Sequence, residues 1–136
     1  MNEEIYISDS FGDFNIVVEG DEHSLWAYVF ENVNEEYQIL CDGFICSRGL
    51  TVQSNEDVKT YIEKGSQPPL MEEYASTVAV QENLSPTDIN ISINMVEIIV
   101  EVKNIPFLKI DFEHLKPYSK AVSKDGPYGF AWREEI

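Results

Sequence analysis

The most apolar part of the chain, residues 88–112, shows a hydrophobic alternation that changes phase once. Apolar residues occupy odd positions from Ile89 to Met95, which is the period of a half-buried strand. From Val96 to Val102 they occupy even positions instead. Because a one-residue slip turns every side chain of a strand to the other face, the chain either turns or forms a β-bulge at residues 95–96. We favour the bulge, since no Gly, Pro or Asp marks a turn there.

Residues 103–106, Lys-Asn-Ile-Pro, have the composition of a turn. After it Leu108, Ile110 and Phe112 return on one face of a further strand. Two strands alone are marginally stable in water. The apolar side of this ribbon therefore needs more strands packed against it.

The first third of the chain predicts those strands. Residues 5–7, 14–18 and 25–31 are strand-like, and residues 20–23 form a hairpin loop. Residues 25–31 are apolar on both faces, which is typical of a central strand. Asp42-Gly43 is compatible with a hairpin turn or with a bulge inside one strand. We favour one bulged strand over residues 37–47, because hairpin arms of about five residues would be short.

The clearest helix covers residues 54–64. Ser54 and Asp57 have the spacing of a capping box, and Gly65 is placed to end the helix. The next stretch is less distinct, because the prolines at 68 and 69 could start a helix at Leu70 while residues 75–80 resemble a strand.

The C-terminal tail, residues 113–136, is rich in loop-forming residues but also in aromatic ones. Its aromatic residues are Tyr118, Tyr128, Phe130 and Trp132. We expect this tail to pack back on the sheet, since aromatic side chains are mostly buried. The alternative is an arm that docks on a partner.

The fold class that follows is α+β and β-rich. We predict a curved antiparallel sheet or partial barrel of about six or more strands with one short helix. With 136 residues, 43% of them hydrophobic, the chain is expected to form a single domain over residues 1–136.

The formal net charge is -16, from 9 basic and 25 acidic residues. This balance argues against binding to nucleic acid or to an anionic membrane, because both require lysine and arginine to neutralise phosphates. It favours a basic protein partner attracted by the negative field. Simple solubility is the competing explanation. Residues 109–136 are neutral overall, so the negative charge belongs to the first 108 residues.

The cysteines and histidines predict neither a disulfide framework nor a metal site. If Asp42-Gly43 is a hairpin turn, Cys41 lies opposite Phe44 and Cys46 opposite Ile39, so the two thiols do not meet. If the strand runs straight through, they lie on opposite faces, and in both cases no second pair completes a zinc site. We expect reduced thiols, no metal and no cofactor. Reduced thiols suit the cytoplasm, and no secretion signal or membrane-spanning apolar run is evident.

No catalytic motif is present, such as a nucleophile elbow, a zinc-protease helix or a phosphate-binding loop. We therefore expect a protein that is not an enzyme. An enzyme would require a concave site in which carboxylates, or a carboxylate with His23 or His114, converge.

Three stretches carry a resemblance: residues 23–28 (HSLWAY), 118–122 (YSKAV) and 125–129 (DGPYG). Together with the acidic, β-rich character, they resemble the small immunity proteins that bacteria encode beside secreted or contact-delivered toxins. The resemblance implies a cytoplasmic protein that binds a toxin domain and blocks its active site.

Our functional hypothesis is a non-enzymatic binding protein that neutralises or sequesters a basic protein partner such as a toxin domain. The acids expected to face the partner lie in predicted loops: Asp21, Glu22, Glu35, Glu36, Glu72 and Glu73. The alternative is a small-ligand binder with an apolar cavity inside the curved sheet, lined by Trp26, Tyr28 and Phe30. A homodimer formed through an edge strand is left open.

Overall fold

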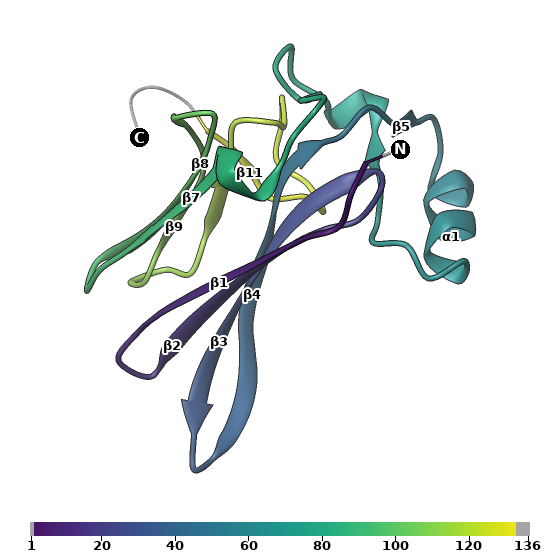
Figure 1. The fold of residues 1–136 in the computed structure, drawn as a ribbon. Helices are drawn as coiled ribbons and strands as arrows, with labels where there is room; N and C mark the ends of the chain where they lie inside the picture. The colour runs from purple at the N-terminus through teal and green to yellow at the C-terminus, as the bar shows by residue number, and fades with distance from the viewer. Residues whose placement is uncertain (1, 133–136) are drawn as a thin grey trace.

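The computed structural model describes residues 2–132, and most of the strands in this part of the chain belong to two β-sheets (Figure 1). The first sheet has the strand order β1-β2-β3-β4, with bounds β1 Ile5–Phe11, β2 Phe14–Gly20, β3 Ser24–Val33 and β4 Glu36–Ser47. The second has the order β11-β10-β9-β8-β7, with bounds β7 Ile89–Ile93, β8 Glu97–Val102, β9 Ile105–Asp111, β10 Pro117–Ser119 and β11 Phe130–Ala131. All neighbouring strands in these sheets are antiparallel except β10 and β11, which are parallel.

The remaining elements are short. They are β5 Thr51–Val52, which pairs in parallel with β6 Leu70–Met71, the helix α1 Asn55–Glu63, and the 3-10 turns η1 Glu72–Tyr74 and η2 Pro86–Asp88. The predicted fold class is confirmed: the part of the chain that the structure describes is β-rich and mainly antiparallel, with one α-helix. Within residues 2–132 the strands form two facing sheets and no closed barrel.

The main core lies between the two sheets, where β1 approaches β7 and β4 approaches β9 and β10. Alternate residues of each strand point into it, for example Ile16 and Val18 from β2 and Val100 from β8, all fully buried. In β2 and β8 the period-two pattern of the sequence therefore identified the inward faces correctly.

The strand β4 runs unbroken through Asp42-Gly43, as favoured from the sequence. Its register with β3 shifts twice, so that Leu40 and Ile45 are extra residues at bulges. One bulge lies between the two cysteines, and it brings Cys41 and Cys46 to the same inner face. The prediction of opposite faces is wrong, because it assumed an unbroken alternation. Both cysteines are free thiols.

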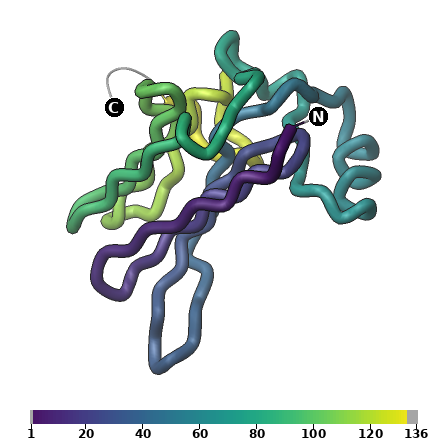
Figure 2. The backbone as a smooth tube through the Cα atoms, in the orientation of Figure 1, coloured from purple at the N-terminus to yellow at the C-terminus, as the bar shows by residue number. Residues whose placement is uncertain are grey.

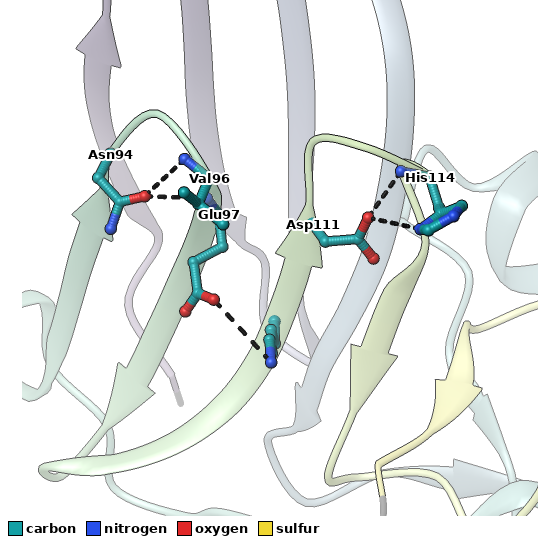
Figure 3. A network of polar contacts seen from close by, with 6 residues as sticks. Asn94, Val96, Glu97, Asp111 and His114 are labelled. Atoms are coloured by element: carbon teal, nitrogen blue, oxygen red, sulfur yellow. Dashed lines mark hydrogen bonds and ion pairs between the residues drawn. The ribbon is translucent and has the colours of Figure 1, made fainter.

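The phase change at residues 95–96 is a turn, so the predicted bulge is wrong. The side-chain oxygen of Asn94 accepts hydrogen bonds from the backbone amides of Val96, at 2.7 Å, and Glu97, at 3.0 Å (Figure 3). An asparagine that bonds its own backbone two residues on supplies the turn chemistry that a search for Gly, Pro and Asp overlooked.

The helix prediction is confirmed, with Ser54 as the N-cap accepting from the amide of Asp57. No helix begins at Leu70, which instead belongs to β6. Residues 75–80 do not form a strand. Ser76 explains this, because its hydroxyl accepts from the amide of Val78 and its carbonyl from the amide of Ala79, which curls the chain.

The tail was predicted to pack back on the sheet, and its residues 133–136 lie outside the described residues. Within the described part, β10 and β11 extend the second sheet. In the segment that connects β10 to β11, the ring of Tyr128 packs against Trp26 and Phe44, which lie on the outer face of the first sheet. A second apolar cluster thus covers one end of that outer face. Its members are Trp26, Phe44, Val52, Leu70, Met71, Ala79, Ala121, Val122 and Tyr128.

Candidate functional site

The other end of the outer face of the first sheet carries large side chains that remain exposed or half-buried. We call this surface the aromatic face and define it as Tyr6, Val17, Tyr28, Phe30, Tyr37 and Ile39. Strand register places these residues side by side: Val17 pairs with Tyr28, and Phe30 with Ile39. The β3–β4 hairpin, which carries Tyr37 and Ile39, extends beyond the neighbouring turns (Figure 2).

Three members of the aromatic face are largely exposed. Tyr6 retains 68% of its accessible surface, Tyr37 67% and Ile39 66%. Beside them lies an open depression of about 360 Å³, lined by Tyr6, Ser8, Asn15, Val17, Phe30 and Tyr37. Grouped exposed apolar side chains of this kind mark interaction surfaces, whereas single ones are ordinary.

Two further depressions continue from this one toward α1. The first, of about 310 Å³, shares Tyr6 and is lined by Glu4, Ile5, Tyr6, Glu19, Gly20, Asp21, Gly65 and Gln67. The second, of about 400 Å³, shares Asp21 and Gly65 and is lined by Asp21, Glu22, His23, Tyr61, Lys64, Gly65 and Ser66. Among the described residues that line these three depressions, Lys64 is the one Lys or Arg. The two depressions toward α1 are lined by the acids Glu4, Glu19, Asp21 and Glu22, whereas the described lining of the first depression is uncharged.

The negative field reaches the aromatic face itself. Burial, together with the nearby carboxylates of Glu19, Asp42 and Asp21, raises the pKa of the Tyr28 hydroxyl to about 12. Asp42, which pairs with Tyr28, also has a raised pKa because of partial burial. These carboxylates therefore surround a half-buried ring without a described basic partner in contact.

Asp21 holds this region together. One carboxylate oxygen accepts from the amides of His23 and Ser24, both at 2.9 Å. The other accepts from the amide of Gln67, at 2.8 Å, and from the hydroxyl of Ser66, at 3.1 Å. Burial alone would raise the pKa of Asp21, but these hydrogen bonds outweigh burial and lower it. Asp21 thus stays charged while it connects the β2–β3 turn to the segment after α1.

Arg48 fixes the same end of the sheet from the inside. It is 3% exposed, and its guanidinium donates to the backbone carbonyls of Glu3, at 2.6 Å, Asp21, at 2.8 Å, and Leu84, at 3.2 Å. The chain just before β1, and hence the position of Tyr6, is held by these bonds.

The six acids predicted to face a partner fall into two groups. Asp21 and Glu22 lie in the β2–β3 turn, while Glu35 and Glu36 lie at the β3–β4 turn. The ten residues of β3 separate these turns by roughly 30 Å. These four acids lie at the two ends of the sheet that carries the aromatic face.

The other two acids lie on η1, in the layer that covers the rest of the outer face. Glu73 forms an ion pair with Lys124 at 2.9 Å, and Glu72 accepts a hydrogen bond from Gln53. These contacts place Glu72 and Glu73 apart from the aromatic face.

The three residues predicted to line an internal cavity share one face but not one cavity. Trp26 is buried, and its indole nitrogen donates to the carbonyl of Pro68 at 3.0 Å. The hydroxyl of Tyr28 donates to the side chain of Gln67 at 2.6 Å. Of the three, Phe30 lines the 360 Å³ depression. The expected cavity site is corrected accordingly: these side chains point away from the core between the sheets, because they alternate with the core residues of β3.

The two histidines lie at opposite ends of the molecule. His23 packs edge-on against Tyr61, with ring centroids 5.3 Å apart, in the depression beside α1. His114 lies 3.2 Å from Asp111, near the β7–β8 turn (Figure 3). Within residues 2–132, no three His, Cys, Asp or Glu side chains are grouped in a way that could hold a metal ion.

Sequence reasoning missed Tyr6, Tyr37 and Ile39. Tyr37 and Ile39 alternate in phase with Cys41, so they read as core positions of one continuous strand. The extra residue Leu40 shifts the alternation by one position, so Tyr37 and Ile39 point to the outer face while Cys41 points to the inner face.

No family model, curated protein or solved structure matches this chain. In the described part of the chain, no helix has the length and apolar character needed to cross a membrane.

Proposed function

We propose that this protein binds a basic protein partner through the aromatic face and thereby neutralises or sequesters it. The observation that carries the proposal is a group of exposed aromatic and aliphatic side chains on an open sheet face, beside a depression lined by Glu4, Glu19 and Asp21. Aromatic residues are enriched at the centres of protein interfaces, where they supply most of the binding free energy.

The exposed tyrosine rings can contribute to the binding free energy of such an interface. A tyrosine side chain buries roughly 200 Å² when fully covered. Tyr37 and Tyr6, each about two-thirds exposed, could therefore each bury about 130 Å² more on binding. At about 25 cal/mol per Å² this is up to about 3 kcal/mol per residue, before the costs of association are subtracted.

The charge of the protein would act mainly on the rate and selectivity of association. A net charge of -16 attracts basic surfaces and repels acidic ones over distances of about 10 Å. The resemblance to immunity proteins suggests a toxin domain as the partner, held so that its active site is blocked.

The test begins with a photo-crosslinking amino acid at position 37, with position 105 as the matched control. Ile105 is also exposed, at 49%, but it lies on β9 of the second sheet. We expect position 37 to crosslink a basic protein in the cell of origin and position 105 not to do so.

The affinity of the identified partner then decides the proposal. Tyr37→Ala should weaken binding by about tenfold or more, and Ile105→Ala by less than about threefold, as measured by calorimetry. Equal effects of the two substitutions, or a crosslinked partner with an acidic surface, would refute docking on the aromatic face.

A further inference from the structure

We propose that the 360 Å³ depression of the aromatic face receives an arginine side chain of the partner. This inference rests on the proposed function and specifies its central contact. It is built from the residues that line the depression and from the charge around it.

The lining suits a flat cation better than an aliphatic side chain. Tyr6, Phe30 and Tyr37 supply aromatic rings, and Val17 supplies an apolar surface. A guanidinium stacks on aromatic rings, and its hydrocarbon stem packs on apolar groups. A purely apolar guest would use the rings but not the polar groups beside them.

Those polar groups are the hydroxyl of Ser8 and the amide of Asn15, which also line the depression. Both offer an oxygen that can accept from a guanidinium, which carries five N–H donors. An apolar guest would remove water from these oxygens without replacing its hydrogen bonds, and this is unfavourable.

Charge complementarity points to the same guest. Glu19 pairs with Tyr6 across β1 and β2, and Asp42 pairs with Tyr28 across β3 and β4. The described residues that line the depression include no lysine or arginine. A carboxylate guest would be repelled, and a lysine would lose a strongly held hydration shell that arginine holds less tightly.

The probe for this site is acetyl-arginine-methylamide, titrated into the intact isotope-labelled protein and followed by NMR. We expect saturable shifts, at millimolar concentration, of the amides of Ser8, Asn15 and Tyr37. The citrulline analogue, which has nearly the same shape but no charge, should bind at least about fivefold more weakly. The leucine and lysine analogues should also bind more weakly.

Two variants test the role of the rings. Tyr37→Phe keeps the aromatic ring and should leave the affinity for the arginine probe within about twofold. Tyr37→Leu keeps an apolar group but removes the ring, and it should weaken the probe at least about threefold.

The inference is overturned if the citrulline, leucine or lysine analogue binds as well as arginine, or if the arginine probe causes no saturable shifts in the depression. Such results would leave docking on the aromatic face to be judged separately, by the crosslinking and affinity measurements at positions 37 and 105. Failure of the arginine site and failure of the proposed function are therefore distinguishable.

Discussion

Replacing Asp21 with asparagine should lower the free energy of unfolding by about 1.5 kcal/mol, because one of its two carboxylate oxygens becomes an amide NH2 group, which cannot accept a hydrogen bond. The retained oxygen can still accept from the amides of His23 and Ser24 in the β2–β3 turn. The side-chain amide nitrogen of asparagine cannot accept from the backbone amide of Gln67, which in the wild type donates to Asp21 at 2.8 Å. Ser66 loses less, since its hydroxyl has a second acceptor at 3.0 Å, the carbonyl of Gln67.

The magnitude comes from the hydrogen bond that is lost. A bond to a charged acceptor contributes about 1.5–3 kcal/mol, and the half-exposed position of Asp21 favours the lower end. Asp21→Ala removes all four bonds and should cost about 3 kcal/mol. The exposed neighbour Glu22 provides the control, and Glu22→Gln should change stability by less than about 0.5 kcal/mol.

The pH dependence has a definite sign. The pKa of Asp21 is lowered in the folded protein, because hydrogen bonds from backbone amides outweigh the opposing effect of burial. A lowered pKa stabilises the fold above the unfolded value of about 3.9, and this stabilisation is lost as the pH falls through the lower folded value. The difference between the wild type and Asp21→Asn should be constant from about pH 7 to about pH 5 and shrink below about pH 4.

Urea denaturation followed by tryptophan fluorescence measures these differences, since Trp26 is buried in the fold. The reasoning fails if Asp21→Asn is no more destabilising than Glu22→Gln at pH 7. It also fails if the difference between the wild type and Asp21→Asn grows as the solution is acidified.

Two further predictions concern buried groups. Tyr128→Phe removes the hydroxyl that bonds the buried carbonyl of Pro69 and the amide of Met71, and it should lower the free energy of unfolding by about 2 kcal/mol in urea denaturation. Tyr6→Phe, at an exposed position, should lower it by less than about 0.5 kcal/mol. Similar losses for the two variants would contradict this account. Burial raises the pKa of the Cys46 thiol to about 12 and that of the Cys41 thiol to about 11. At pH 8 a thiol reagent should therefore modify both cysteines at least about tenfold more slowly in the folded than in the unfolded protein. Equal rates would show that the thiols are not protected.

Much of the fold could be read from local patterns. Alternation located β2, β3, β8 and β9, and the Ser54 cap located α1, because both signals depend on residues close together in sequence. The turn at Asn94 was also readable in principle, since it depends on one side chain bonding its own backbone. The sequence predicted a bulge in β4 at Asp42-Gly43, but the two bulges lie at Leu40 and Ile45. Their positions were not readable, because an extra residue is defined only relative to the strand paired with it.

The candidate site was less accessible. The acids of the β2–β3 and β3–β4 turns were predicted as surface residues, but their relation to the aromatic face follows from strand register. The structural role of Asp21 was missed, because its partners Ser66 and Gln67 are 45 and 46 residues away in sequence.

The amino-acid sequence by itself determined which residues share a face of strands without bulges such as β2, where the helix begins and that the protein is strongly acidic. Only the tertiary structure decided which faces stay open to solvent. Trp26 and Phe30 belong to the same face of β3, yet Trp26 is covered by Pro68 and Tyr128, which come from distant parts of the chain, whereas Phe30 lines an open depression. Alternation is a local property of a strand, but covering a face depends on segments that only folding brings together.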